Sequence, residues 1–210
     1  IDEINRGNLS KIFGELIYAL EYRNEKIRLQ YADFDDDKSN DFLVIPENLY
    51  IIGTMNTADR SISLFDTAMR RRFAFIPMMV DYNLVARKFG LDEFDEENLR
   101  DELESSEPHK EKSILSLLVV YKLNKKISED LRMGREKQIG HTYLLQILKN
   151  DEQFLNVWKY QIIPLLEEFY ASKFEELEEI LTKGIIDKYT GLKDFSEEEL
   201  LDTLYSIIDV

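Results

Sequence analysis

Hydrophobic positions near the start of the chain follow a helical spacing. Between Asn5 and Tyr22, apolar residues recur at positions 9, 12, 13, 16, 17 and 20, which predicts a helix with one buried face. Two short segments, 27–31 and 42–45, flank an acidic stretch and are predicted to pair as a hairpin. The first 45 residues are therefore expected to form one helix and one pair of antiparallel strands.

The next segments alternate between strand-like and helix-like patterns. Residues 49–54 are a continuous apolar run typical of a buried strand. Residues 62–71 are predicted to be a helix, and residues 72–79 a second strand that Pro77 limits toward its end. A strand, a helix and a strand in this order predict a parallel crossover and an α/β layer.

After residue 80 the pattern is helical almost throughout. Pro164 lies inside one predicted helix and should kink or split it, and Gly184 and Gly191 are predicted to end helices. The predicted helices cover residues 82–89, 95–105, 110–131, 142–148, 151–171, 173–182 and 196–208. We expect an α+β, mainly α fold, with a truncated α/β core of parallel strands and a hairpin over residues 1–80 and an all-α domain over 81–210.

Composition excludes several classes of protein. The 210 residues contain no cysteine, so neither a disulfide framework nor a thiolate metal site can form. No apolar run approaches the ~20 residues that span a bilayer, and we expect a cytoplasmic protein without a membrane segment. Residues 81–210 hold 29 acidic and 17 basic side chains and carry most of the net charge of −15. Because an acidic surface repels phosphate backbones, broad nonspecific DNA binding by this chain alone is not expected.

Two polar segments are candidates for phosphoryl-transfer chemistry. In such enzymes a strand-terminal Asp holds Mg²⁺, commonly through water, and a neighbouring acid orients the attacking water, roles that suit Asp2 and Glu3. Asp-Glu pairs are also common at solvated helix starts. Asn56 follows the predicted strand 49–54, where its amide can hydrogen-bond a γ-phosphate or the attacking water, or can simply form a turn and helix cap.

Arg70, Arg71 and Arg72 form a cluster of positive charge where the predicted helix 62–71 ends. Such a cluster complements the helix macrodipole. It can instead stabilise the charge of a transferring phosphoryl group, with at least one arginine reaching a neighbouring subunit. The helix by itself leaves both interpretations open.

Two apparent metal motifs fail on detail. The acidic stretch from Asp33 to Asp41 imitates a calcium loop, but Lys38 stands where a glycine is required and Val44 where the bidentate glutamate should be. A solvated hairpin tip fits this stretch better. His109 and His141 are far apart and have no ligand-like neighbours, so no histidine metal site is expected.

Five segments, taken in order, are more specific than any of them alone. They are Asp-Glu-Ile-Asn-Arg-Gly-Asn-Leu-Ser-Lys-Ile-Phe-Gly-Glu-Leu (2–16), Met-Asn-Thr-Ala-Asp-Arg-Ser (55–61), Asp-x-Ala-x-Arg-Arg-Arg-Phe (66–73), Ile-Gly-His-Thr-Tyr (139–143) and Ile-Pro-Leu-Leu-Glu-Glu-Phe-Tyr (163–170). This series resembles the McrB family of AAA+ NTPases, the motor subunits of modification-dependent restriction systems. The second segment resembles that family's signature, and the resemblance covers residues 1 to about 171.

The resemblance implies roles for the residues near the start of the chain. Asp2 and Glu3 correspond to the Walker B pair, with Asp2 as the Mg²⁺ ligand and Glu3 activating water. Asn56 corresponds to the sensor residue, and Asp59 and Arg60 complete the signature loop at the nucleotide.

Further roles follow for the rest of the chain. One or more of Arg70 to Arg72 act at the interface between subunits, and Gly140 and His141 lie near the nucleotide base or the seam between the core and a helical lid. Gln138 stands where a lid arginine is expected, for which Arg135 is the candidate substitute.

The resemblance also implies cofactors and partners. Family members bind GTP or ATP with Mg²⁺, assemble into rings expected to be hexamers, are stimulated by an McrC-type nuclease, and carry a separate N-terminal domain that reads methylated DNA. This sequence contains no Gly-x-x-x-x-Gly-Lys-Ser/Thr. We therefore expect a C-terminal fragment that begins at Walker B, is inactive alone and binds neither nucleotide nor Mg²⁺ alone. The alternatives are a MoxR-like AAA+ ATPase with a chaperone-type role and a non-catalytic interaction module from a truncated gene.

Overall fold

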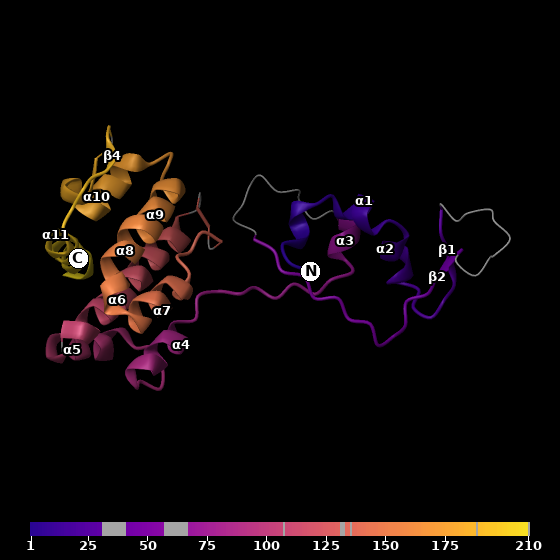
Figure 1. Cartoon of the computed structure of the whole chain (residues 1–210), viewed down its shortest axis with the longest axis horizontal. Coiled ribbons are helices and arrows are strands. Elements are labelled where there is room, and N and C mark those ends of the chain that lie inside the picture. Colours follow the sequence, from indigo (N-terminus) through magenta and orange to yellow (C-terminus); the bar gives the residue numbers. More distant parts are fainter. Residues whose placement is uncertain are drawn as a thin grey trace. The chain divides into compact units, whose positions relative to one another are not determined.

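The computed structural model describes residues 1–30, 41–56, 67–106, 108–130, 133–134, 136–187 and 189–209. The chain divides into two compact units, Ile1–Pro77 and Met78–Val210, whose elements are labelled in Figure 1. The described residues form many helices and two small antiparallel sheets of two strands each. The fold is therefore mainly α, as the hydrophobic pattern predicts.

The first unit is built from short elements. They are η1 (Ile4–Arg6), α1 (Leu9–Phe13), α2 (Glu15–Ala19), β1 (Ile27–Arg28), β2 (Phe42–Leu43) and α3 (Thr67–Arg70). The single helix predicted over 5–22 is interrupted at Gly14, whose φ of 46° and ψ of −123° suit a residue without a side chain. The predicted hairpin is confirmed, since Ile27 pairs with Leu43 in antiparallel register.

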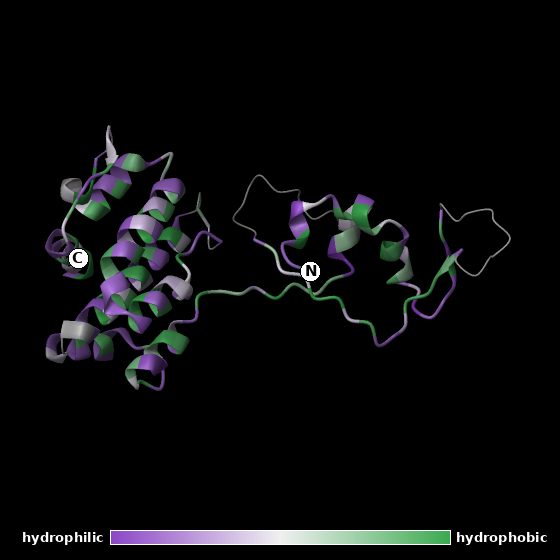
Figure 2. Cartoon of the chain, in the orientation of Figure 1, coloured by the Kyte–Doolittle hydropathy of each residue, from purple (hydrophilic) through white to green (hydrophobic). Residues whose placement is uncertain are grey.

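The strands predicted over 49–54 and 72–79 are not formed in the described part of the chain. Tyr50 and Ile52 are 83% and 80% exposed, and Met78 at the end of the second run is 91% exposed. Figure 2 shows these extended segments coloured as hydrophobic over much of their length. An apolar run becomes a buried strand only where other strands take its backbone hydrogen bonds and other layers cover its faces. Among the described residues, backbone hydrogen bonds to the first of these runs come from the first residues of the chain.

The second unit is a helical bundle with one small hairpin. Its elements are α4 (Tyr82–Ala86), η3 (Arg87–Phe89), α5 (Glu96–Ser105), α6 (Pro108–Glu129), α7 (His141–Lys149), η4 (Asp151–Gln153), α8 (Phe154–Val157), η5 (Trp158–Ile162), α9 (Ile163–Phe169), α10 (Phe174–Ile185), β3 (Ile186–Asp187), β4 (Gly191–Leu192) and α11 (Glu197–Asp209). Helix α6 contacts α5, α7 and α11, and the consecutive residues 113–120 along it are all buried. This helix is the centre of the unit, and each predicted helix beyond residue 80 is represented around it.

Pro164 does not split the helix predicted over 151–171. Elements α8, η5 and α9 follow one another without a break, and the π-helical turn η5 ends just before the proline. Proline lacks an N–H, and its ring clashes with the carbonyl four residues earlier, here that of Tyr160. The wider π turn is a local rearrangement that accommodates this clash.

Both predicted glycine helix ends are wrong. Helix α10 continues past Gly184 to Ile185, with a kink at Thr182. Gly191 instead begins β4 with a φ of 75°, in the tight turn of the β3–β4 hairpin, which the hydrophobic pattern did not predict. The side chain of Asp187 accepts hydrogen bonds from two backbone N–H groups of this turn. A strand of two residues is too short to leave a periodic signal in the sequence.

The core of the second unit contains satisfied polar groups. The indole N–H of Trp158 donates to the Ser116 hydroxyl over 2.9 Å. Asn124, 1% exposed, accepts from the backbone N–H of Ile139 (2.7 Å) and donates to the carbonyl of the same residue (2.9 Å) and to the hydroxyl of Tyr82 (2.8 Å). Burial raises the pKa of Tyr82, and the hydrogen bond from Asn124 opposes that rise. Asn124 thus joins α6 to α4 and to the segment that leads into α7.

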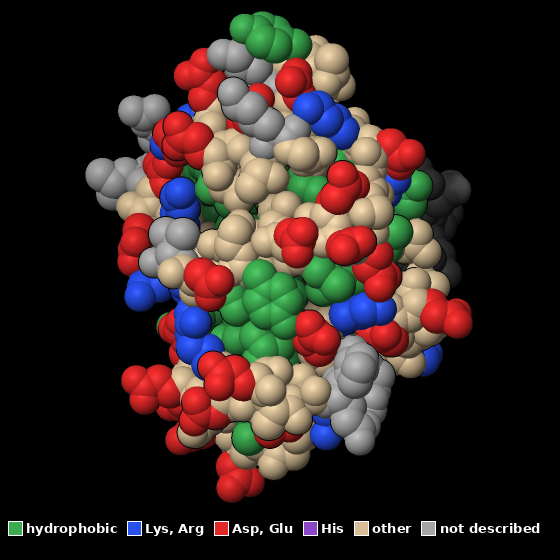
Figure 3. All heavy atoms as spheres, turned by 90° about the vertical axis from the view of Figure 1, so that its left-hand side faces the viewer, with side chains coloured by type: hydrophobic (Ala, Val, Ile, Leu, Met, Phe, Trp, Pro, Cys, Tyr) green, Lys and Arg blue, Asp and Glu red, His purple; other side chains and the backbone are tan. Residues whose placement is uncertain are grey.

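The surface of the second unit is rich in acidic side chains. Figure 3 shows them spread over one face, with a small hydrophobic patch near its centre. Among the described residues, no helix combines the length and the apolar character needed to cross a bilayer.

We predict that Asn124→Ala lowers the free energy of unfolding by about 2–4 kcal/mol, because both backbone polar groups of Ile139 then stay buried without a partner. Urea denaturation followed by the fluorescence of Trp158, the only tryptophan in the sequence, measures this loss. The matched control is Asn98→Ala on the exposed face of α5, expected to change stability by no more than about 0.5 kcal/mol. Equal stability of the two variants would contradict the role given to Asn124.

Candidate functional site

The first residues of the chain lie beside residues 52–54. The nitrogen of Ile1 donates to the carbonyl of Ile52 over 2.8 Å. The N–H of Thr54 donates to the carbonyl of Ile1 over 2.9 Å, and the N–H of Ile4 donates to the carbonyl of Thr54 over 2.8 Å. Donors and acceptors thus alternate between the two segments, as they do in a pair of parallel strands. The polar residues that follow each segment therefore meet at the same end.

Gly53 allows the two segments to approach closely. A Cβ atom at this position would lie 2.9 Å from the Cδ1 atom of Ile4, closer than real side chains come. A side chain at this position would therefore require the Ile4 side chain to shift.

The polar ends of the two segments are joined through side chains. The hydroxyl of Thr54 accepts from the backbone N–H of Glu3 over 3.1 Å and donates to Oδ1 of Asp2. The side chain of Asn5, 7% exposed, donates to the backbone carbonyl of Asn56 over 3.1 Å. Asp2, Glu3 and Asn56 are thus brought together within one set of hydrogen bonds.

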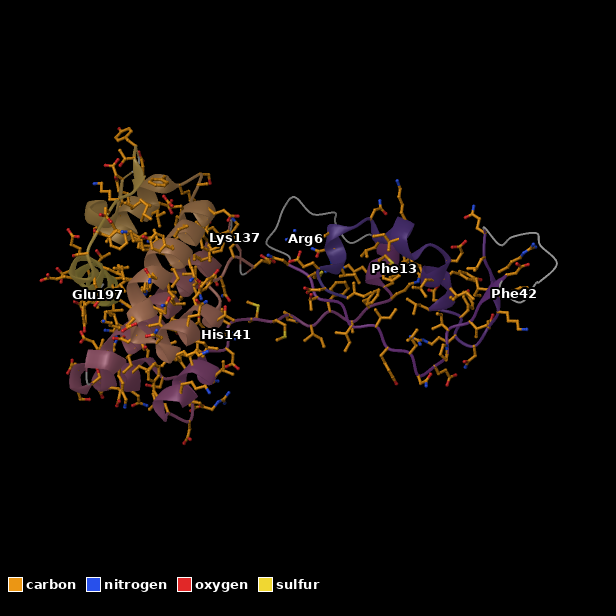
Figure 4. The ribbon with its side chains drawn as sticks, viewed as in Figure 1. Arg6, Phe13, Phe42, Lys137, His141 and Glu197 are labelled. Atoms are coloured by element: carbon orange, nitrogen blue, oxygen red, sulfur yellow. The ribbon has the colours of Figure 1, made fainter. Side chains whose placement is uncertain are left out.

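Glu3 has an unusual backbone conformation. Its φ of 46° and ψ of 50° lie in the left-handed region, which residues with side chains seldom adopt. Its carboxylate forms an ion pair with the guanidinium of Arg6, which is labelled in Figure 4. The side chain of Asp2 is engaged by Thr54 instead, so the two neighbouring carboxylates have different partners.

A small hydrophobic cluster fixes the surroundings of these groups. Met69 on α3 is fully buried against Ile4 and Leu9, and Met55 and Phe73 pack against them. These apolar residues adjoin, in sequence, the acidic pair, the amide and the arginine cluster. One core therefore holds all three polar segments of the first unit.

The three arginines have different environments. Arg72 is half-buried and forms an ion pair with Glu21. Arg70 lies 5.1 Å from the centre of the Phe75 ring. Arg70 and Arg71 are both exposed.

Two further predicted site residues lie in the second unit, and two lie outside the described residues. Gly140 and His141 belong to the second unit, where Nδ1 of His141 accepts a hydrogen bond from the backbone N–H of Asp81 over 3.1 Å (Figure 4 labels His141). Gly140 precedes α7 with an extended backbone. Asp59 and Arg60 lie outside the described residues.

The chemistry of these carboxylates suits a magnesium ion that binds together with a phosphate substrate. Asp2 is exposed and offers hard oxygen donors, and no group of three or more potential metal-binding side chains occurs among the described residues. Mg²⁺ is commonly held by one or two carboxylates, with water and substrate phosphates completing its octahedron. A single Asp beside a nucleotide is therefore a suitable protein ligand.

Two further residues of the site were not singled out from the sequence. They are Thr54, which forms hydrogen bonds with Asp2 and Glu3, and Asn5, which forms one with Asn56. Their signal was present but weak: a hydroxyl at the end of an apolar run, and an amide two positions after an acidic pair.

Comparisons with known families match two parts of the chain. A model of the AAA domain (dynein-related subfamily) matches residues 1–73, and a model of the alpha-helical lid domain of McrB matches residues 117–180. The first match contains the acidic pair, the amide and the arginine cluster. The second covers the centre of the helical unit.

Two curated relatives are similar to the chain. It is 37% identical over 181 residues to the EcoKMcrB subunit of the type IV methyl-directed restriction enzyme of Escherichia coli (strain K12), an alignment that covers 81% of this chain and 36% of that protein. It is 34% identical over 85 residues to component YdiS of the type II restriction enzyme BsuMI of Bacillus subtilis (strain 168), which covers 36% of this chain and 24% of that protein. The chain thus spans about a third or less of these relatives. The chain belongs to the McrB family of AAA+ proteins.

Proposed function

We propose that this chain supplies the Walker B, sensor and arginine segments and the helical lid of an McrB-like NTPase that powers DNA restriction. The names of its relatives, a subunit of a methyl-directed restriction enzyme and a component of a second restriction enzyme, support this role. The observation that carries the proposal is the hydrogen bonding that gathers Asp2, Glu3 and Asn56 at one end of two parallel segments.

Each of these three groups has a chemical task in the proposal. Asp2 holds Mg²⁺ through water, and the bound ion neutralises charge on the β- and γ-phosphates. The Glu3 carboxylate accepts a hydrogen bond from the attacking water and orients it in line with the γ-phosphate. The amide of Asn56 donates a hydrogen bond to the γ-phosphate or to that water without adding negative charge.

The arginine cluster acts on a neighbouring subunit in the proposed ring. Arg72 is engaged with Glu21, so its guanidinium links the residues that follow α3 to those that follow α2. Arg70 and Arg71 are both exposed, but Arg70 lies over an aromatic ring, so Arg71 is our choice for the group that reaches the transferring phosphoryl group. A positive charge aimed at the developing charge of a transition state stabilises it more than the ground state.

The intact assembly has further proposed parts. The nucleotide is GTP or ATP, the ring is a hexamer in the cytoplasm, an McrC-like nuclease is the partner, and a separate domain reads modified DNA. Gly140 and His141 are assigned to the nucleotide base or to the seam between the core and the lid, and Asp59 and Arg60 to the signature loop after Asn56. Residues 1–80 contribute to the α/β core and residues 81–210 form the lid.

We expect these 210 residues alone to show no GTP or ATP turnover above background, because the sequence contains no phosphate-cradling glycine loop. Release of inorganic phosphate from either nucleotide with Mg²⁺ measures this. Hydrolysis that depends on Glu3 in the isolated chain would contradict the prediction.

In the full-length natural protein, Glu3→Gln should lower the turnover number by about 10²–10⁴-fold, because a carboxamide, unlike the carboxylate it replaces, cannot accept a proton from the attacking water. Nucleotide affinity, measured by equilibrium binding of a fluorescent analogue, should stay within about threefold of wild type. Glu25→Gln removes an exposed carboxylate from the same unit and serves as the control, with unchanged turnover. Full activity of Glu3→Gln would overturn the proposed role.

Arg71→Ala should affect turnover, whereas Arg72→Ala should affect stability. We expect Arg71→Ala to lower turnover of the natural assembly by roughly 10³–10⁵-fold with unchanged thermal stability. Arg72→Ala should lower the melting temperature, because Glu21 loses its half-buried partner. Mixing Arg71→Ala subunits with Glu3→Gln subunits should restore some activity, because a mixed interface can combine an intact Glu3 with an intact Arg71. No recovery on mixing, with mixed rings verified, would argue against action in trans.

A further inference from the structure

We propose that Thr54 is the residue that positions both Walker B carboxylates, holding the Asp2 side chain and fixing the turned backbone at Glu3. The inference rests on the proposed function. It adds a residue that touches neither nucleotide nor water in that scheme and acts through Asp2 and Glu3.

The Thr54 hydroxyl serves two partners at once through a single oxygen. It donates to Oδ1 of Asp2 and accepts from the backbone N–H of Glu3. A methyl group in its place can do neither, and an amine or a carboxylate serves one of these directions only. A residue on the second segment thereby fixes two consecutive residues of the first.

Thr54 also ends the parallel pairing of the two segments. Its carbonyl accepts from the N–H of Ile4, while the N–H of Glu3, one residue earlier, goes to the hydroxyl. Glu3 lies between these two hydrogen bonds and has the left-handed backbone. Such a conformation is strained and persists only where its surroundings hold it. The Thr54 hydroxyl is one of the groups that hold it.

This arrangement separates the tasks of two adjacent acids. Thr54 holds one oxygen of the Asp2 carboxylate, and this carboxylate would hold Mg²⁺ through water when the ion is bound. The turned backbone directs the Glu3 carboxylate to a different partner, Arg6. Loss of the hydroxyl would leave Asp2 free to rotate and Glu3 free to relax to an extended backbone, so both tasks would suffer together.

The test compares Thr54→Val, which keeps the shape and removes the hydroxyl, with Thr54→Ser, which keeps the hydroxyl. In the full-length natural protein, Thr54→Val should lower kcat by about 10–100-fold, the range typical when a partner of a metal-binding side chain is removed. KM for the nucleotide should change by less than about threefold, and the Mg²⁺ concentration for half-maximal turnover should rise. Thr54→Ser should restore kcat to within about threefold of wild type.

A second readout does not depend on activity. Hydrogen exchange measured by mass spectrometry on the peptide that contains residues 1–6 should show faster exchange in Thr54→Val, because the Glu3 amide loses its acceptor, and near wild-type exchange in Thr54→Ser. Thr190→Val, at an exposed position in the β3–β4 turn, is the matched control, and both readouts should be unchanged for it.

The outcomes separate the inference from the proposed function. Wild-type kcat and exchange in Thr54→Val, with Glu3→Gln inactive, would overturn the role of Thr54 alone. Equal loss of kcat in Thr54→Val and Thr54→Ser would show that side-chain volume matters rather than the hydroxyl, and would also overturn it. Full activity of Glu3→Gln would instead remove the proposed function. Loss in Thr54→Val with recovery in Thr54→Ser would support the inference.

Discussion

The pairing of the first residues with residues 52–54 is the contact on which the candidate site depends. Three backbone hydrogen bonds set the register and direction of two segments that are about fifty residues apart in the chain. Gly53 allows the approach, because a side chain there would collide with Ile4. A shift of one residue would separate Thr54 from Asp2 and Asn5 from Asn56, since side chains alternate in direction along an extended chain. The acids and the amide then would no longer share one end.

The two units differ in how completely they bury their apolar residues. In the second unit the centre of α6 is enclosed by other helices, and the buried polar groups of Asn124 and Trp158 have partners. In the first unit the described core is small, and large apolar side chains such as those of Tyr50, Ile52 and Ile76 are exposed. Hydrophobic burial supplies most of the driving force for folding. The helical unit therefore has the stronger internal basis for stability, and the site lies in the unit with less.

The sequence predicted elements held by local interactions more accurately than elements that need partners far away in the chain. Helices such as α5 and α11 were anticipated closely, because an amphipathic helix makes its backbone hydrogen bonds within itself and shows its buried stripe in the sequence. The strand predictions at 49–54 and 72–79 failed, because a strand requires partners that its own residues do not provide. The π turn before Pro164 was also missed, since the sequence marks the disturbance but not how the helix absorbs it.

The sequence by itself determined which chemical groups are available and in what order: an acidic pair, an amide after an apolar run, three arginines and a long helical region. Only the tertiary structure decided which of these meet. It placed the Thr54 hydroxyl between Asp2 and Glu3, and it committed Arg72 to Glu21 while leaving Arg71 exposed. Local preferences act between near neighbours in the chain, whereas these contacts join residues about fifty positions apart. Their formation depends on the register and packing of the whole unit, which no short segment encodes alone.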